Sequence, residues 1–430
     1  MTLGLWALLG CVAAGALLRL PLALVMFAGG AAYLFATHQD VGLLVGQVMS
    51  QMTAMYVLVA IPMFILAANI MNAASISDRL WAAANAVVGR FRGGMGHVTV
   101  LVSMIFSSMS GSAVTDAAGP GLVATKMMRD IGRYPPGLAC AITAASATIA
   151  PIIPPSIPLI IYALLSGASI GALFLAGLVP GLMMGGALML CIRLVAGRRG
   201  LPVGERVPLA EIPPVFGRAA LSLTLPVVLL GGIWSGIFTP TEAAAVAAFW
   251  ALALGTLVYR RIGRVQVNEV LSESTRQSAS TMLLIASAFI LNYAIANERL
   301  AEHLLVAIND MQLSPLQFML AVNLLFLVLG CFLDGSVMML VFVPLLLPSA
   351  RALGIDLTYF GIVTTLNFMI GLITPPYGLL LFVMASLTRV PLAAIIREIW
   401  PFVLTLAAVL ALLTIFPSIT LFLPRFFGYN

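Results

Sequence analysis

The most informative segment of this sequence is Thr148-Ile149-Ala150-Pro151-Ile152-Ile153-Pro154-Pro155-Ser156-Ile157-Pro158, which lies within an apolar run over residues 138–165. Proline lacks a backbone N–H and its ring clashes with the preceding turn, so the four prolines cannot share one continuous helix. At bilayer depth, freed backbone groups are tolerated only beside protein or a watery cavity. The segment therefore predicts a broken transmembrane helix that binds an ion or a solute, rather than a simple proline kink.

A second copy of this segment occurs later in the chain, as Asn367-Phe368-Met369-Ile370-Gly371-Leu372-Ile373-Thr374-Pro375-Pro376-Tyr377-Gly378. Pro180 and Pro401 are separated by the same number of residues as Pro154 and Pro375. This period is too long for a solenoid repeat. The chain is therefore predicted to consist of two homologous halves that contribute paired half-sites.

Two further apolar segments, over residues 98–125 and 315–350, carry turn-forming residues at their centres. Ser110-Gly111-Ser112 interrupts the first segment, and Asp334-Gly335-Ser336 interrupts the second at a corresponding position. We interpret each segment as a hairpin that enters and leaves the membrane on one side, because a crossing helix would not tolerate a turn at its centre.

The composition belongs in lipid rather than water. The 430 residues are 62% hydrophobic and only 8% charged, with a mean hydropathy of +1.11. Apolar runs of about 20 residues predict about five spans and one hairpin in each half, and these spans include residues 53–71 and 279–296. An odd number of crossings places the second half upside down relative to the first.

The predicted fold class is thus an all-α polytopic membrane protein with two inverted-topology repeats, each with a re-entrant hairpin and a broken helix. The first repeat covers residues 1–197 and the second covers residues 219–430. A connecting loop over residues 198–218 joins them, and the second broken helix lies over residues 357–385.

The basic residues favour one orientation. If the first span runs from outside to inside, only Arg299, Arg351 and Arg425 among the 21 Lys and Arg residues lie outside, which satisfies the positive-inside rule. The connecting loop is then cytoplasmic. The net charge of +6 is explained by topology, and nucleic-acid binding is a poor interpretation because the basic residues are spread over several short loops.

Other functional classes are disfavoured by missing patterns in the sequence. The four cysteines form no CxxC pair and the three histidines are far apart, so no transition-metal site is predicted. There is no Walker A sequence for ATP use. No His/Glu metal set or Ser–His pair occurs in the spans, which argues against an intramembrane enzyme. Two half-sites suit alternating access better than a continuous channel pore.

Several strings together resemble one known family: Ser110-Gly111-Ser112-Ala113-Val114-Thr115-Asp116, Ile152-Ile153-Pro154-Pro155-Ser156, Gly177-Leu178-Val179-Pro180-Gly181 and Ile237-Phe238-Thr239-Pro240-Thr241-Glu242. In these, and over nearly its whole length, the chain resembles the large membrane subunit, of the DctM type, of tripartite ATP-independent periplasmic (TRAP) transporters. The strings are rare and occur in the family's order.

The resemblance implies an elevator-type secondary transporter in the bacterial inner membrane, in which a domain with both hairpins and both broken helices moves against a fixed scaffold. It implies sodium-coupled uptake of an organic acid, usually a carboxylate, from a periplasmic substrate-binding protein. It also implies a small membrane subunit of about four helices, here expected to be a separate chain. The alternative is a stand-alone ion-coupled organic anion transporter of similar architecture.

The hairpin tips and helix breaks supply the candidate ligands. Hydroxyl and carbonyl oxygens suit sodium, the only ion predicted as a cofactor, and helix N-termini present amides to a carboxylate; turn formation alone is the alternative explanation. The predicted ion- or solute-binding residues are Ser110, Gly111, Ser112, Asp116, Thr148, Pro154, Pro155, Ser156, Asp334, Gly335, Ser336, Thr374, Pro375 and Pro376.

A few polar residues within apolar segments have alternative explanations. A carboxylate such as Asp116 within an apolar segment costs free energy unless it has a partner or a bound ion, so Asp116 is predicted to bind one. The alternative is that it caps a short helix. Glu242 is predicted to close a capping box with Thr239. Asn69, Asn292 and Asn323 are predicted either to hydrogen-bond across helices or to contact the solute.

Overall fold

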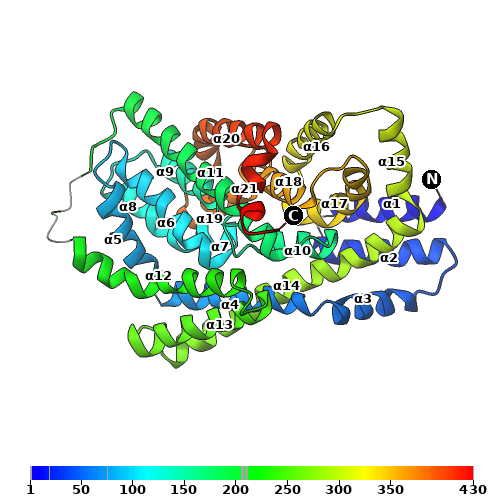
Figure 1. Ribbon diagram of the computed structural model, residues 1–430, viewed down its shortest axis with the longest axis horizontal. Coiled ribbons are helices and arrows are strands. Elements are labelled where there is room, and N and C mark those ends of the chain that lie inside the picture. The colour runs from blue at the N-terminus through cyan, green and yellow to red at the C-terminus, as the bar shows by residue number, and fades with distance from the viewer. Residues whose placement is uncertain (1, 19, 75, 205–207, 209–211, 430) are drawn as a thin grey trace.

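The computed structural model describes residues 2–18, 20–74, 76–204, 208 and 212–429. Helices make up most of this part of the chain (Figure 1). The helices of the first repeat are α1 (Leu3–Leu17), α2 (Leu22–Ala36), α3 (Gly42–Ala54), η1 (Tyr56–Val59), α4 (Ala60–Ala73), α5 (Ile76–Val88), α6 (Gly94–Ser110), α7 (Ala113–Ala118), α8 (Pro120–Asp130), α9 (Pro136–Ala147), α10 (Ile157–Ser166) and α11 (Ile170–Arg199).

The second repeat follows the same order of elements. Its helices are α12 (Ile212–Trp234), α13 (Pro240–Ala253), η3 (Leu254–Val258), α14 (Arg264–Asn297), α15 (Leu300–Asp310), α16 (Pro315–Gly330), α17 (Gly335–Ala352), α18 (Leu357–Gly371), α19 (Leu379–Thr388), α20 (Leu392–Ile415) and α21 (Pro417–Phe426).

The predicted fold class is confirmed, because each repeat contains a hairpin followed by a broken helix. The first hairpin is α6 with α7 and α8, and the second is α16 with α17. The broken helices are α9 with α10, and α18 with α19. Their boundaries lie close to the predicted ranges of residues 138–165 and 357–385. The Pro154–Pro155 and Pro375–Pro376 peptide bonds at the two breaks are both cis.

The helical structure around two predicted spans extends beyond the predicted bounds. The helical region over residues 53–71 is preceded by α3, and the span over residues 279–296 is the second half of α14, which begins at Arg264. Hydropathy did not mark these extensions because they are rich in polar side chains. Arg264, Gln266 and Glu269 are good helix formers, so α14 includes a polar first half. In the first repeat α3 is a separate helix that ends at Ala54.

Within the described residues, six helices are long and apolar enough to cross a membrane. One of them is α17, an arm of the second hairpin, so length and composition alone do not separate a hairpin arm from a span. The six are Tyr56–Ala73, Ile170–Arg199, Pro240–Val258, Arg264–Asn297, Gly335–Ala352 and Leu392–Ile415.

The connecting loop is shorter than predicted, because α11 continues to Arg199 and α12 already begins at Ile212. Gly200 closes α11 in the left-handed conformation that favours glycine. Residues 205–207 and 209–211 of the predicted loop, with Arg206, lie outside the described residues. The predicted capping box of α13 is confirmed, since Thr239 N donates to Glu242 Oε2 at 2.8 Å and Glu242 N donates to Thr239 Oγ1 at 3.3 Å.

The broken helices form the centre of the molecule. Every residue from Gly137 to Ser156 is buried, and α9 packs against α6, α8 and α20. Large apolar side chains on the peripheral helices are exposed, such as Trp6 on α1 and Phe249 on α13. An apolar exterior of this kind fits a lipid environment.

Candidate functional site

The first hairpin tip packs directly against the first helix break. Gly111 lies between α6 and α7 with φ +61°, the left-handed region that favours glycine. A Cβ atom at this position would lie 2.3 Å from the carbonyl oxygen of Pro155. No side chain fits there, so glycine is required for the tip and the break to touch.

Hydroxyl groups at the first break satisfy backbone groups that the missing helical turns leave free. Thr148 Oγ1 donates to the carbonyl oxygen of Ala145 at 2.6 Å. Ser156 Oγ donates to the carbonyl oxygen of Pro151 and accepts from Leu159 N at 3.2 Å, which caps α10. These contacts explain how a break can be buried in the centre of the protein.

The second tip and the second break meet in the same way. Tyr377 N donates to the carbonyl oxygen of Cys331 at 3.1 Å. A Cβ atom on Gly371 would lie 3.0 Å from Cα of Gly330, so α16 and α18 cross at two glycines. Thr374 Oγ1 donates to the carbonyl oxygen of Ile370 at 2.7 Å, like Thr148 in the first half. Each half therefore builds one compact unit of tip and break.

Both tips open onto a single cavity of about 640 Å³. This volume is within the range of pockets that hold small organic ligands. The wall contributed by the tips and half-helices includes Ser110, Gly111, Ser112, Ile157, Pro158, Asp334, Gly335, Ser336 and Leu379. The two tips that the repeat related in sequence are thus brought together in space.

Other predicted site residues do not line the cavity. Those of the first half are buried, whereas Thr374 and Pro375 are partly exposed and Pro376 is exposed. These residues are Asp116, Thr148, Pro154, Pro155, Ser156, Thr374, Pro375 and Pro376.

Asp116 has a different environment from the one predicted for a tip ligand. It is fully buried on α7, and its Oδ2 accepts a hydrogen bond from Ser103 Oγ on α6 at 2.7 Å. Its Oδ1 has no hydrogen-bond partner among the described residues. Asp116 thus links the two arms of the first hairpin below the tip.

The cavity wall combines groups for anions and for cations. The first turns of α10, α17 and α19 contribute Ile157, Gly335 and Leu379 to the wall. Helix N-termini carry unpaired amides and a partial positive charge, which suit a carboxylate. At the end of α6, Ser110 Oγ is buried without a hydrogen-bond partner among the described residues, and hydroxyl and carbonyl oxygens suit a hard cation such as sodium.

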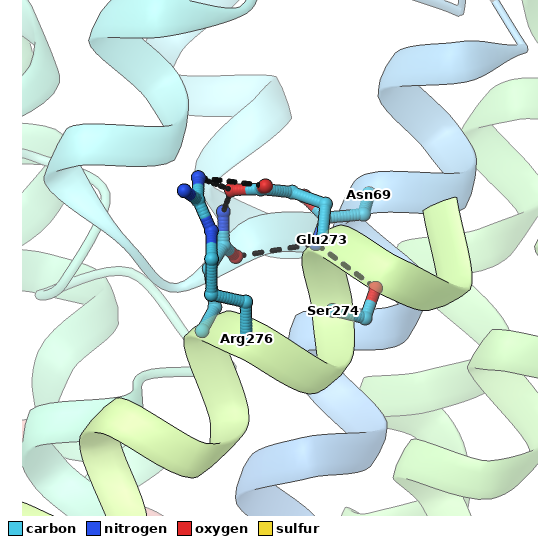
Figure 2. Close-up of polar contacts among 5 residues, drawn as sticks. Asn69, Glu273, Ser274 and Arg276 are labelled. Carbon is cyan, nitrogen blue, oxygen red and sulfur yellow. Dashed lines mark hydrogen bonds and ion pairs between the residues drawn. The ribbon is translucent and has the colours of Figure 1, made fainter. Parts of the chain in front are cut away.

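The opposite wall of the cavity was not predicted. It includes the polar face of α14, with Gln277, Ser280 and Thr281, together with apolar residues of α2 and α4. Asn69 on α4 donates from Nδ2 to Ser274 Oγ at 3.0 Å and to Gln277 Oε1 at 3.2 Å, and Figure 2 shows this contact between Asn69 and α14. The available signal was the helical spacing of polar residues within 264–281. Of the two predicted options for Asn69, hydrogen bonding across helices is confirmed.

Comparison with known proteins places the chain in a family. Residues 8–419 match the family described as tripartite ATP-independent periplasmic transporter, DctM component. The sialic acid TRAP transporter large permease protein SiaM of Vibrio cholerae is 41% identical over 87% of this chain and 88% of its own. The C4-dicarboxylate TRAP transporter large permease protein DctM of Pseudomonas aeruginosa is 39% identical over 87% of this chain and 88% of its own.

A solved structure supports the fold. The YdaH transporter of Alcanivorax borkumensis superposes with a TM-score of 0.58 at 15% sequence identity and covers 86% of each chain. This likeness concerns the fold alone, whereas the sequence relatives are named as transporter permeases and not as enzymes. The chain belongs to the DctM family of TRAP transporter large permeases.

Proposed function

We propose that this chain is the large permease of a sodium-coupled transporter that takes up an organic acid delivered by a periplasmic binding protein. The observation that carries the proposal is the single cavity onto which both hairpin tips and three helix N-termini open. The relatives named for sialic acid and for C4-dicarboxylates share one chemical feature in their solutes, the carboxylate. Helix N-termini are suited to this group.

The coupling ion in this proposal binds at the tips. The first site is formed by Ser110, Gly111 and Ser112 with the break over residues 148–156, and the second by Asp334, Gly335 and Ser336 with the break over residues 374–376. Backbone carbonyls at the ends of half-helices and nearby hydroxyls are typical sodium ligands in secondary transporters. Sodium also offsets the charge of a carboxylate that crosses a hydrophobic seal.

The moving unit in this proposal consists of the hairpins and the broken helices. Their tip and break contacts make them one packed body, whereas α14 and α4 belong to the opposite wall. An elevator movement of the first body along the second would carry the solute with its ions.

We predict that transport requires partners. The two repeats occupy the described chain, and no additional bundle of four helices occurs among the described residues. Proteoliposomes with this chain alone should accumulate no sialic acid or C4-dicarboxylate, whereas addition of the small membrane subunit and the binding protein should give sodium-dependent uptake. Robust accumulation by the chain alone would support the stand-alone transporter instead.

We further predict the orientation of the chain in the inner membrane. In a cysteine-free background, Ala352→Cys, at the end of α17, should react with a membrane-impermeant maleimide in intact cells. Val203→Cys, in the connecting loop, should react only after the membrane is permeabilised. Both positions are exposed, so access to the reagent reports the side of the membrane. Reaction of Val203→Cys in intact cells would contradict the inverted-repeat topology.

A further inference from the structure

A groove lies between α11 and α20, which pack against each other. It has a volume of about 480 Å³ and shares no lining residue with the cavity at the hairpin tips. Its lining includes Cys191 and Val409, which are buried, and Leu190, Leu194 and Leu412, which are exposed. The groove is therefore an apolar channel that opens on the outer surface of the molecule.

The groove has the length of one membrane leaflet. On α11 its lining runs from Ala187 to Arg198 along one helix face, and on α20 it runs from Pro401 to Leu412. At a rise of about 1.5 Å per residue, each stretch is roughly 16 Å long. The hydrocarbon core of a bilayer is about 30 Å thick, so each stretch spans half of it. One acyl chain of a phospholipid covers the same depth.

Positive charge is confined to one end of the groove. Arg198 is exposed and is the only charged residue among the described residues that line it. Arg198 forms no salt bridge within the described chain, whereas the neighbouring Arg199 is paired with Glu398 at 2.6 Å. Arg397 is also exposed, and it lies four residues before Pro401 on the same face of α20. Two guanidinium groups are thus available at this end.

The charged end of the groove has the features of a membrane surface. Trp400 is 46% exposed, and aromatic side chains of this kind gather at the level of the lipid headgroups. Arg198 and Arg199 end α11 just before the connecting loop. In the predicted orientation this end faces the cytoplasm, where basic side chains next to the membrane attract anionic headgroups. The apolar remainder of the groove then extends into the cytoplasmic leaflet.

We propose that the groove between α11 and α20 binds one anionic phospholipid of the phosphatidylglycerol type. Its phosphate accepts hydrogen bonds from Arg198 and Arg397, since a planar guanidinium matches the geometry of phosphate oxygens. One acyl chain lies along the apolar lining past Cys191. A headgroup without an amine fits this end, because an ammonium group would be repelled by the two guanidinium groups. The site is separate from the cavity and does not depend on which solute is transported.

The bound lipid links two helices that support the first break. A Cβ atom on Gly181 of α11 would lie 2.3 Å from Cγ1 of Ile153, so α11 is in close contact with the break. On the other side of the groove, α20 packs against α9, the first half of the broken helix. A lipid that contacts both α11 and α20 therefore stabilises the folded body that contains the break.

The test uses the membrane assembly of this chain with its small partner, purified in detergent and stripped of lipid. Thermal unfolding midpoints are measured with phosphatidylglycerol, phosphatidylethanolamine or cardiolipin that carry the same acyl chains. Native mass spectrometry measures how tightly each lipid is retained. A ligand that binds the folded protein raises the midpoint. Phosphatidylglycerol should raise it most.

One substitution tests the headgroup site. Arg198→Gln should weaken the binding of phosphatidylglycerol on the order of tenfold, because a hydrogen bond between charged groups is lost. Arg193→Gln is the matched control, since it removes the same charge from an exposed side chain of the same helix that does not line the groove. Equal affinities in the two variants would overturn the headgroup site.

A second substitution tests the acyl-chain site without a change of charge. Ala408→Phe places a ring in the groove and should abolish retention of phosphatidylglycerol, because the chain and the ring compete for the same space. Ala411→Phe is the matched control, since Ala411 is exposed on the same helix and does not line the groove. If Ala408→Phe retains the lipid as well as Ala411→Phe, the chain does not lie between α11 and α20.

The comparison of lipids can also contradict the proposal. Equal stabilisation by phosphatidylethanolamine and phosphatidylglycerol would overturn the requirement for a net negative headgroup. Tighter retention of cardiolipin would overturn the assignment to a lipid with a single phosphate. Glycerol 3-phosphate, the headgroup fragment without acyl chains, should not raise the midpoint at the same concentration. Stabilisation by this fragment equal to that by the lipid would show that the apolar groove contributes nothing to binding.

Discussion

Gly111→Ala is expected to abolish sodium-dependent uptake by the assembled transporter. The left-handed backbone at this position costs an L-residue roughly 1–2 kcal/mol, and the added methyl group would meet the Pro155 carbonyl oxygen at 2.3 Å. This neighbour is backbone within a buried break and cannot swing aside. The tip must separate from the break, and the proposed first ion site would lose its geometry.

Gly167→Ala provides the matched control. Gly167 ends α10 with φ +74°, so it shares the backbone penalty, but no atom lies within 4 Å of a Cβ atom at this position. Uptake is measured in proteoliposomes under a fixed sodium gradient, with the amount of folded protein checked by size-exclusion chromatography. If Gly111→Ala transports as well as Gly167→Ala, the contact between tip and break has no role in transport.

Asp334→Ala is expected to raise the sodium concentration for half-maximal uptake on the order of tenfold. The substitution removes a charged ligand from the proposed second site and also removes the cap of α17, a loss of about 1 kcal/mol. Asp356→Ala removes a cap alone, since Asp356 accepts from Thr358 N at 2.7 Å outside the cavity. The difference in half-maximal sodium concentration between the two variants therefore reports the effect of Asp334 on ion binding, apart from the loss of a helix cap.

Ser112→Ala should weaken sodium dependence through the first site, in the same assay. Its effect should be smaller than that of Asp334→Ala, because a neutral hydroxyl is lost instead of a charge. Sodium dependence identical to that of the parent in both variants would show that the tips are only structural turns.

The breaks and the tips could be predicted from sequence because their signals are local. Prolines such as Pro154 and Pro375 forbid a continuous helix whatever surrounds them, and Gly111 marks a turn in a segment otherwise suited to a helix. Each of these sequence features also occurs in both halves of the chain, which strengthened the prediction. These features depend on backbone geometry, which a short stretch of residues determines.

The polar wall of α14 could not be predicted in the same way. Hydropathy separates lipid from water and does not recognise a polar helix face that lines an internal cavity, so the first half of α14 had no signal as a span. The environment of Asp116 could not be predicted from sequence either. The sequence placed this carboxylate within an apolar segment, but its contact with Ser103 depends on how α6 packs against α7.

The long helix α14 has a counterpart in the first repeat that is not continuous. α14 runs unbroken for 34 residues, whereas α3 and α4 are separated at Met55, where φ is −108° and ψ is 75°. The second repeat thus contributes a continuous helix at this position, whereas the first repeat contributes two helices with an interruption between them. In a transporter with identical inverted repeats, exchanging their conformations would give inward-open and outward-open states of equal free energy. In the proposed elevator mechanism, a continuous helix in one repeat and an interrupted one in the other would make the two states unequal in free energy. We therefore expect the protein to favour one side of the membrane before any gradient is applied.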